Sequence, residues 1–161
     1  MATNETSLLI FDLAGSCWGV PAQEIQELLP AVTLTPVPSK YADLEGLVNL
    51  RGTLTPVKDL RRLLNMQPKK MEPTDHLIIA GRKGQLVAWR VDRANEVLHL
   101  KSHELDSRAS EKLGAIPLLS GIARIDCRVI LILDTTILFQ LPQVQGTEIS
   151  LPAPETLNFD R

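Results

Sequence analysis

The chain has 161 residues, of which 44% are hydrophobic, 22% charged and 4% aromatic, and its formal net charge is −2. This length is typical of one domain with a substantial buried core. The slightly acidic balance and the scarcity of aromatic rings argue against nucleic acid or an anionic membrane as the main partner, since those surfaces select basic patches and stacking platforms.

The chain shows no targeting or membrane segment in its sequence. Residues 1–7 have neither the basic stretch nor the apolar stretch of a secretory signal. The longest purely apolar run, residues 129–133, is far shorter than the roughly 20 residues that a membrane helix needs. Cys17 and Cys127 stand alone, outside any metal or redox spacing, and are expected to be free thiols. We therefore expect a cytoplasmic protein.

The first predicted elements form a hairpin. Residues 7–13 are apolar and end at a glycine turn, and residues 17–20 resume as a strand. Pro21 stops this strand because proline fixes φ and lacks an amide proton. Residues 23–29 stay open between helix and strand, because seven residues are too few for the period to decide.

Two strands of a second hairpin follow. Prolines keep residues 31–38 extended or looped, and residues 41–45 fit one helical turn. Residues 46–50 and 53–57 are predicted strands. Gly52 lies at the bend between them, where a tight turn often requires a positive φ.

Two aspartates are predicted helix caps. Asp59 precedes a short helix at residues 60–64, and its carboxylate is suited to accept the free amides of the first turn. Asp134 repeats this arrangement before residues 135–139. A catalytic role for either residue is the weaker interpretation.

The second half repeats the plan of the first. Residues 65–74 form a polar connector, residues 76–80 and 85–91 are predicted strands, and residues 101–111 are a charged linker. Residues 142–161 contain three prolines and no clear period, so we expect flexible termini at 1–6 and 142–161.

An internal duplication sets the fold class. Residues 46–64 match residues 121–139 without a gap at a constant offset of 75. We therefore expect one domain over residues 7–141, built from two halves at about 7–65 and 75–141. About ten short strands with little helix favour paired small β-barrels over a parallel α/β sheet.

Catalytic patterns are missing from the sequence. His76, His99 and His103 have no cysteine or carboxylate neighbours at metal-ligand spacing. There is also no nucleophile elbow and no zinc-protease motif. We therefore expect a protein that is not an enzyme and needs no cofactor.

The two copies differ at the bend of the hairpin. Only the first copy places an arginine, Arg51, beside a glycine there, and the second copy has Asp126 at the matching position. A guanidinium at a rigid corner can make forked hydrogen bonds to a carboxylate, and Glu27 is the nearest plausible partner. The alternative is that Arg51 and Glu27 are ordinary solvated side chains.

The bend of the first copy and the segments around it resemble those of a known family. The stretch GLVNLRGTLTPVKDL is similar to the central signature of the CheW family of bacterial chemotaxis coupling proteins. LLIFDLAGSCWGVPAQEIQELL resembles the family's opening strands, and LLSGIARIDCRVILILDTTILF resembles its closing hairpin. The similarity covers residues 7–141. Lys58 and Arg90 depart from it, because the family more often has apolar residues there.

The resemblance implies a fold and a function. The fold would be mostly β, with two intertwined five-stranded SH3-like β-barrel subdomains and a few short helices. The function would be that of a cytoplasmic, non-enzymatic adaptor without a cofactor, which couples chemoreceptor tips to the regulatory domain of a CheA-type histidine kinase at receptor arrays. Nucleic-acid binding and membrane insertion are not expected, whereas exposed strand edges would allow weak self-association.

The resemblance also implies partner-binding positions. Four contacts and two residues that hold the bend carry over, namely Ile25, Glu27, Gly46 and Arg51, with Asn49 and Gly52. In the family the receptor hairpin docks in an apolar groove between the subdomains, and Ile25 is the candidate for that contact. An adaptor of a pilus or surface-motility pathway is the alternative within this class. A β-barrel that binds a ligand or nucleic acid, and an enzyme, are the alternatives outside it.

Overall fold

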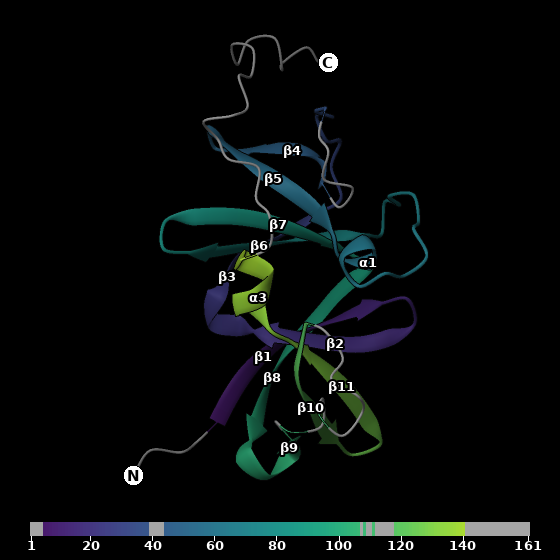
Figure 1. Ribbon diagram of the computed structural model, residues 1–161, viewed down its shortest axis with the longest axis vertical. Coiled ribbons are helices and arrows are strands. Elements are labelled where there is room, and N and C mark those ends of the chain that lie inside the picture. The colour runs from purple at the N-terminus through teal and green to yellow at the C-terminus, as the bar shows by residue number, and fades with distance from the viewer. Residues whose placement is uncertain (1–4, 39–43, 107, 109–110, 112–117, 141–161) are drawn as a thin grey trace.

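The computed structural model describes residues 5–38, 44–106, 108, 111 and 118–140 (Figure 1). The strands of the described residues are β1 (Glu5–Leu13), β2 (Ser16–Pro21), β3 (Ile25–Pro30), β4 (Leu44–Leu50), β5 (Thr53–Asp59), β6 (His76–Arg82), β7 (Gln85–Val91), β8 (Arg93–Lys101), β9 (Leu105–Asp106), β10 (Leu119–Ile125) and β11 (Arg128–Leu133). The helical elements are η1 (Ala22–Glu24), α1 (Leu60–Leu63), η2 (Ser102–Glu104) and α3 (Thr135–Gln140). The expected mostly β fold is confirmed.

The strands form two sheets that follow each other along the long axis of the molecule (Figure 1). The first sheet has the order β8-β1-β2-β11-β10-β9, and the second has the order β3-β6-β7-β5-β4. Each sheet takes strands from both sequence halves, so the halves are intertwined. Four strand pairs join the two halves: β2 with β11 and β5 with β7 are parallel, whereas β1 with β8 and β3 with β6 are antiparallel. The first sheet has six strands rather than five because the short β9 adds to its edge.

The duplication is visible in the positions of the strands. β4 and β5 match β10 and β11 at the offset of 75, and the β1–β2 hairpin matches the β6–β7 hairpin at an offset of 69. The turns of the latter pair, Ala14-Gly15 and Lys83-Gly84, have positive φ at both positions. This is the backbone that a two-residue hairpin needs to follow the twist of its strands.

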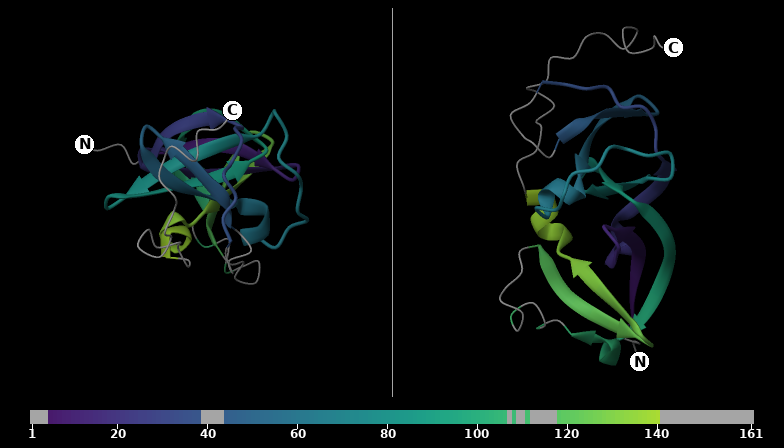
Figure 2. Two further views of the ribbon diagram at one scale, coloured as in Figure 1. Left: turned by 90° about the horizontal axis from the view of Figure 1, so that it is seen from above. Right: turned by 90° about the vertical axis from the view of Figure 1, so that its right-hand side faces the viewer.

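Three apolar cores hold the sheets together. One lies on the inner face of the first sheet, around Leu8 and Ile10, and one lies on the inner face of the second sheet, around Leu77 and Ile79. The third core lies between the sheets and contains alternate residues of the same strands. Phe139 of α3 belongs to this middle core, and Figure 2 shows α3 at the junction of the sheets. Successive residues of a strand point to opposite faces, so a strand between two cores is apolar throughout.

Four local expectations need correction or completion. Residues 25–30 form strand β3 rather than a helix, because they pair with β6 along the edge of the second sheet. Part of the expected linker at 101–111 folds as η2 and β9, since Leu105 and Asp106 pair with β10. Leu44 and Glu45 begin strand β4, and the rest of the proposed turn at 41–45 lies outside the described residues. Glu5 and Thr6, expected in a flexible terminus, instead pair with β8 at the start of β1, whereas residues 1–4 and 142–161 lie outside the described residues.

Candidate functional site

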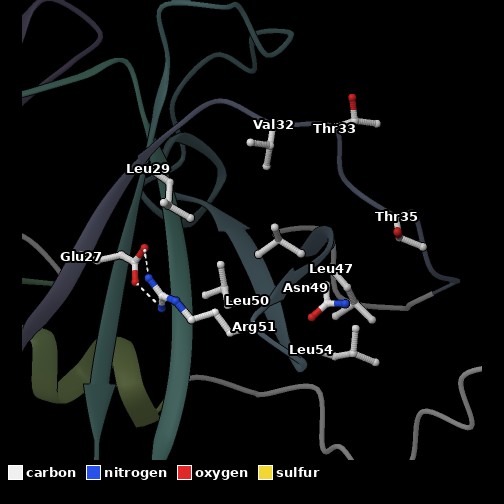
Figure 3. Close-up of a pocket in the computed structure, with 11 residues that line it drawn as sticks. Glu27, Leu29, Val32, Thr33, Thr35, Leu47, Asn49, Leu50, Arg51 and Leu54 are labelled. Carbon is white, nitrogen blue, oxygen red and sulfur yellow. Dashed lines mark hydrogen bonds and ion pairs between the residues drawn. The ribbon is translucent and has the colours of Figure 1, made fainter. Parts of the chain in front are cut away.

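A groove of about 490 Å³ opens between β3 and β4, the two outer strands of the second sheet (Figure 3). Leu29, Val48 and Leu50 belong to its lining and to the core of this sheet. Thr35 and Leu47 exchange two backbone hydrogen bonds of 2.9 and 2.8 Å. These bonds tie the segment after β3 to β4, and we call residues 31–38 the wall segment.

An ion pair closes one side of the groove (Figure 3). Nη1 of Arg51 lies 2.9 Å from Oε1 of Glu27, and Nη2 lies 3.3 Å from Oε2. The hydrogen bond to Glu27, together with its charge, raises the pKa of Arg51. The predicted pairing of these two residues is therefore present. With 79% of its side chain exposed, Arg51 contributes shape and hydrogen-bonding capacity rather than stability.

The bend holds Arg51 in a fixed place. Arg51 has a φ of 50° and Gly52 a φ of 91°, which are the values of a hairpin turn with two left-handed residues. The side chain of Asn49 accepts a 2.8 Å hydrogen bond from the amide of Gly52 and so fastens the turn. The expected bend-holding positions of Asn49 and Gly52 thus have a local physical basis.

Gly46 supports the wall segment from beneath. A Cβ atom at this position would lie 2.6 Å from the carbonyl oxygen of Thr35 and 3.2 Å from Cβ of Leu34. Only glycine lets β4 and the wall segment approach this closely. Gly46 is itself buried, so its role within the chain is this support, and a partner contact at this position stays a prediction.

Ile25 lies on the other face of β3. Glu27 and Leu29 each pair with a β6 residue that belongs to the core of the second sheet. Ile25 and Leu28 each pair with a β6 residue that belongs to the middle core. A β-bulge between Ile25 and Glu27 produces this change of face. The expected apolar contact and the ion pair are therefore on opposite sides of one strand.

Two exposed apolar side chains near the middle core were not singled out from the sequence. Leu28 is 41% exposed and Val97 of β8 is 48% exposed. They occupy matching positions of the two copies, since β3 and β8 match at the offset of 69. Both are paired with residues of the middle core, namely Ile78 and Leu9. The match between the two copies, which places an apolar residue at both positions, was the sequence signal that could have identified Leu28 and Val97.

The second copy has an arginine–glutamate pair of its own, although its arginine does not lie beside a glycine at the bend. Nη1 of Arg128 in β11 lies 2.9 Å from Oε2 of Glu96 in β8. Glu96 matches Glu27 at the offset of 69, but the arginine stands two residues beyond Asp126, which matches Arg51. The shift along the chain hid this pair from the comparison of the bends.

Both aspartates lie at helix starts. Oδ1 of Asp59 accepts a 3.0 Å hydrogen bond from the amide of Arg61, and Oδ1 of Asp134 accepts one of 3.0 Å from the amide of Thr136. Asp59 is also buried in a charge cluster with Arg90, which the sequence does not reveal.

The described residues were also compared with the requirements of a metal site and of a membrane-spanning helix. Within the described part of the chain, no group of three or more His, Cys, Asp or Glu side chains could hold a metal ion. His99 is engaged by the hydroxyl of Ser7 at 2.7 Å. None of the helices described is long and apolar enough to span a membrane.

Comparison with known proteins gives a consistent picture. The model of the CheW-like domain matches residues 7–143. Chemotaxis protein CheW of Thermotoga maritima is 30% identical over 136 residues, which cover 83% of this chain and 87% of that protein. Protein FrzA of Myxococcus xanthus is 33% identical over 100 residues, which cover 62% and 61% respectively.

The fold has a solved counterpart. The crystal structure of the scaffolding protein TtCheW from Thermoanaerobacter tengcongensis matches with a TM-score of 0.75 and 25% identity. The match covers 90% of this chain and 92% of that chain. The agreement therefore extends over both sheets.

Proposed function

This chain belongs to the CheW-like family, and we propose that it is an adaptor that holds a chemoreceptor tip and a CheA-type histidine kinase in one complex. A scaffold role in chemotaxis is the family's role. The two partners, the coupling between them and a cytoplasmic location at receptor arrays are our proposal for this chain. It requires no catalytic step and no cofactor.

The observation that carries the proposal is the two-sided arrangement of β3. One face presents Glu27, which is paired with Arg51 at the groove, and the other presents Ile25 and Leu28 beside the middle core. An adaptor must hold two partners at the same time, so it needs two surfaces that do not overlap. Opposite faces of one edge strand meet this requirement.

We assign the receptor tip to the apolar side. Leu28 and Val97 are exposed, and each is paired with a residue of the middle core. Burial of such side chains by a helical hairpin would remove apolar area from water, which is the main source of affinity in protein contacts.

We assign the regulatory domain of the kinase to the groove. Its lining is apolar around Leu29 and Leu50, and its rim carries the Arg51 fork. An apolar centre with a polar rim is the usual anatomy of a protein interface, and arginine is enriched at such contacts. Single contacts of this size are modest, and an array would strengthen them by multivalency.

Co-sedimentation with receptor-containing membranes, with and without the kinase, tests this assignment. Leu28→Asp is expected to lose the receptor and keep the kinase, whereas Arg51→Glu is expected to lose the kinase and keep the receptor. Arg128→Glu is the matched control, because it reverses the charge of the corresponding pair in the other copy. Retention of both partners by both variants would reject the assignment, and failure of the unaltered chain to bind either partner would reject the adaptor proposal.

The pathway is a separate question from the adaptor class. FrzA, at 33% identity, is about as similar to this chain as the T. maritima chemotaxis protein at 30%, so identity does not choose between pathways. A flagellar chemotaxis pathway is the first proposal, and a pilus or surface-motility pathway is the alternative. Capture of the cognate kinase with the tagged full chain, followed by its identification, decides between them.

A further inference from the structure

Arg90 is a charged residue in a strand that otherwise reads as apolar, and it is buried. Its side chain is 2% exposed, and its guanidinium contacts three carboxylates. Nη2 lies 2.9 Å from Oε2 of Glu45 and 3.2 Å from Oδ2 of Asp59, and Nη1 lies 2.8 Å from Oδ2 of Asp75. Burial opposes the charge, but the hydrogen bond to Glu45 and the nearby carboxylates outweigh it and raise the pKa of Arg90. The residue therefore keeps its charge.

Two of these carboxylates stand beside the attachments of the groove wall. The backbone oxygen of Asp75 accepts a 3.0 Å hydrogen bond from the amide of Ala31, where the wall segment begins. Glu45 lies two residues before Leu47, which holds Thr35 in the middle of the wall segment. One guanidinium thus fixes the side chains next to both anchors of this segment.

Removal of the guanidinium would disturb these anchors in a defined way. Asp59 and Asp75 are almost completely buried, and a buried carboxylate without its partner is strongly unfavourable. Two cations would remain as partial compensation: Nζ of Lys69 lies 3.0 Å from Oδ1 of Asp75, and Nε of Arg62 lies 3.5 Å from Oδ2 of Asp59. The carboxylates would turn toward water and draw the adjoining backbone with them.

We infer that Arg90 is a positioning residue for the groove, which sets the wall segment against β4 without touching a partner. The inference deepens the proposed function, since it concerns the surface assigned to the kinase. It explains why a buried arginine stands where apolar side chains would fill the same space. The side chains that line the groove give it its shape, and the buried contacts of Arg90 keep the wall segment in place.

The test is amide hydrogen exchange of the full chain, read residue by residue without any partner. Arg90→Met is expected to speed exchange at Ala31, Thr35 and Leu47 by on the order of tenfold more than at Leu9 and Val20 of the first sheet. The same variant is expected to weaken binding of the kinase's regulatory domain by about tenfold, because a misplaced wall removes complementarity.

Arg61→Met is the matched control. It breaks the 2.6 Å ion pair with Asp92 at the rim of the same charge cluster and leaves every contact of Arg90 in place. Exchange at Thr35 and Leu47, taken relative to that at Leu9 and Val20, should therefore stay as in the unaltered chain. Glu45→Gln serves where Arg90→Met does not fold, because it keeps the shape of the side chain and should speed exchange at Leu47 and Thr35 alone.

The outcomes separate the two proposals. Exchange that is unchanged, or that rises equally in both sheets, overturns the positioning role of Arg90. If Arg90→Met speeds exchange locally but the unaltered chain binds no kinase, the positioning role is supported and the function proposed for the groove is rejected.

Discussion

Oε1 of Glu27 lies 2.9 Å from Nη1 of Arg51, and this contact joins the outer strand β3 to the bend between β4 and β5. The two residues are 24 positions apart in the chain and meet only because β3 and β4 are the two outer strands of one sheet. The pair therefore reports on the arrangement of the whole second sheet. A partner that contacts both side chains therefore also depends on the distance between β3 and β4.

Exchange of the two charges tests whether the pair acts as a unit. Glu27→Arg and Arg51→Glu are each expected to weaken kinase binding by on the order of tenfold, since each leaves two like charges facing each other. The double exchange should recover most of the affinity, measured by titration calorimetry. The same exchange at Glu96 and Arg128 is the control and should leave the affinity unchanged. A double variant no better than the weaker single variant would show that each group contacts the partner separately.

Arg51 is expected to serve function at a cost to stability. Its φ of 50° is strained for a residue with a side chain, and glycine relieves such strain. Arg51→Gly should therefore keep or raise the Tm, by about 2 °C at most, while kinase binding falls. Lys83→Gly is the matched control, because Lys83 has a φ of 53° in a similar turn. It should change the Tm in the same direction and leave binding intact. A clear fall in Tm for Arg51→Gly alone would mean that the ion pair, not the backbone, dominates.

The sequence was sufficient for the duplicated hairpins because their signals are local and occur twice. Gly46 and Asp59 recur as Gly121 and Asp134 in a gapless match, so each copy supports the interpretation of the other. Strand β3 lacked such a signal on its own. Its apolar residues fit both periods, and only pairing with β6 selects the extended form.

The charge cluster and the second arginine–glutamate pair could not be predicted for a different reason. Arg90 meets carboxylates that are 15 to 45 residues away, and Arg128 meets Glu96 across 32 residues. No spacing rule connects such positions, because the contacts depend on the order of strands in the sheets. The sequence identified Arg90 as unusual, and only the fold supplied the reason.

The close approach of Thr35 to Gly46 predicts that Gly46→Ala destabilises the fold. The new methyl group would meet the backbone of Thr35, which cannot rotate away, so the wall segment must shift. We expect a loss of about 1–3 kcal/mol in the free energy of unfolding, measured with urea. Gly81→Ala is the control, because the atom closest to its Cβ is Nε2 of Gln26, at the end of a flexible side chain. A similar loss in both variants would mean that the wall segment is not the source of the cost.

The pair of Arg61 and Asp92 gives stability a dependence on pH. Burial alone would raise the pKa of Asp92, but the hydrogen bonds from Arg61 and from the amide of Ala14 outweigh it and lower the pKa below its ordinary value of 3.8. A carboxylate with a lowered pKa in the folded state stabilises the fold at pH values above its ordinary pKa. This contribution is lost as the pH falls through the lowered pKa.

Arg61→Met should therefore be less stable than the unaltered chain by about 1 kcal/mol at pH 7, as expected for a partly exposed pair. The difference should shrink as the pH falls below 3.8, the ordinary value for Asp92. Urea midpoints between neutral and acidic pH measure it, and Arg128→Met, which breaks a more exposed pair, should show a smaller difference. A difference that stays constant down to the lowest pH would assign the loss to packing of the arginine's aliphatic stem, because packing does not titrate.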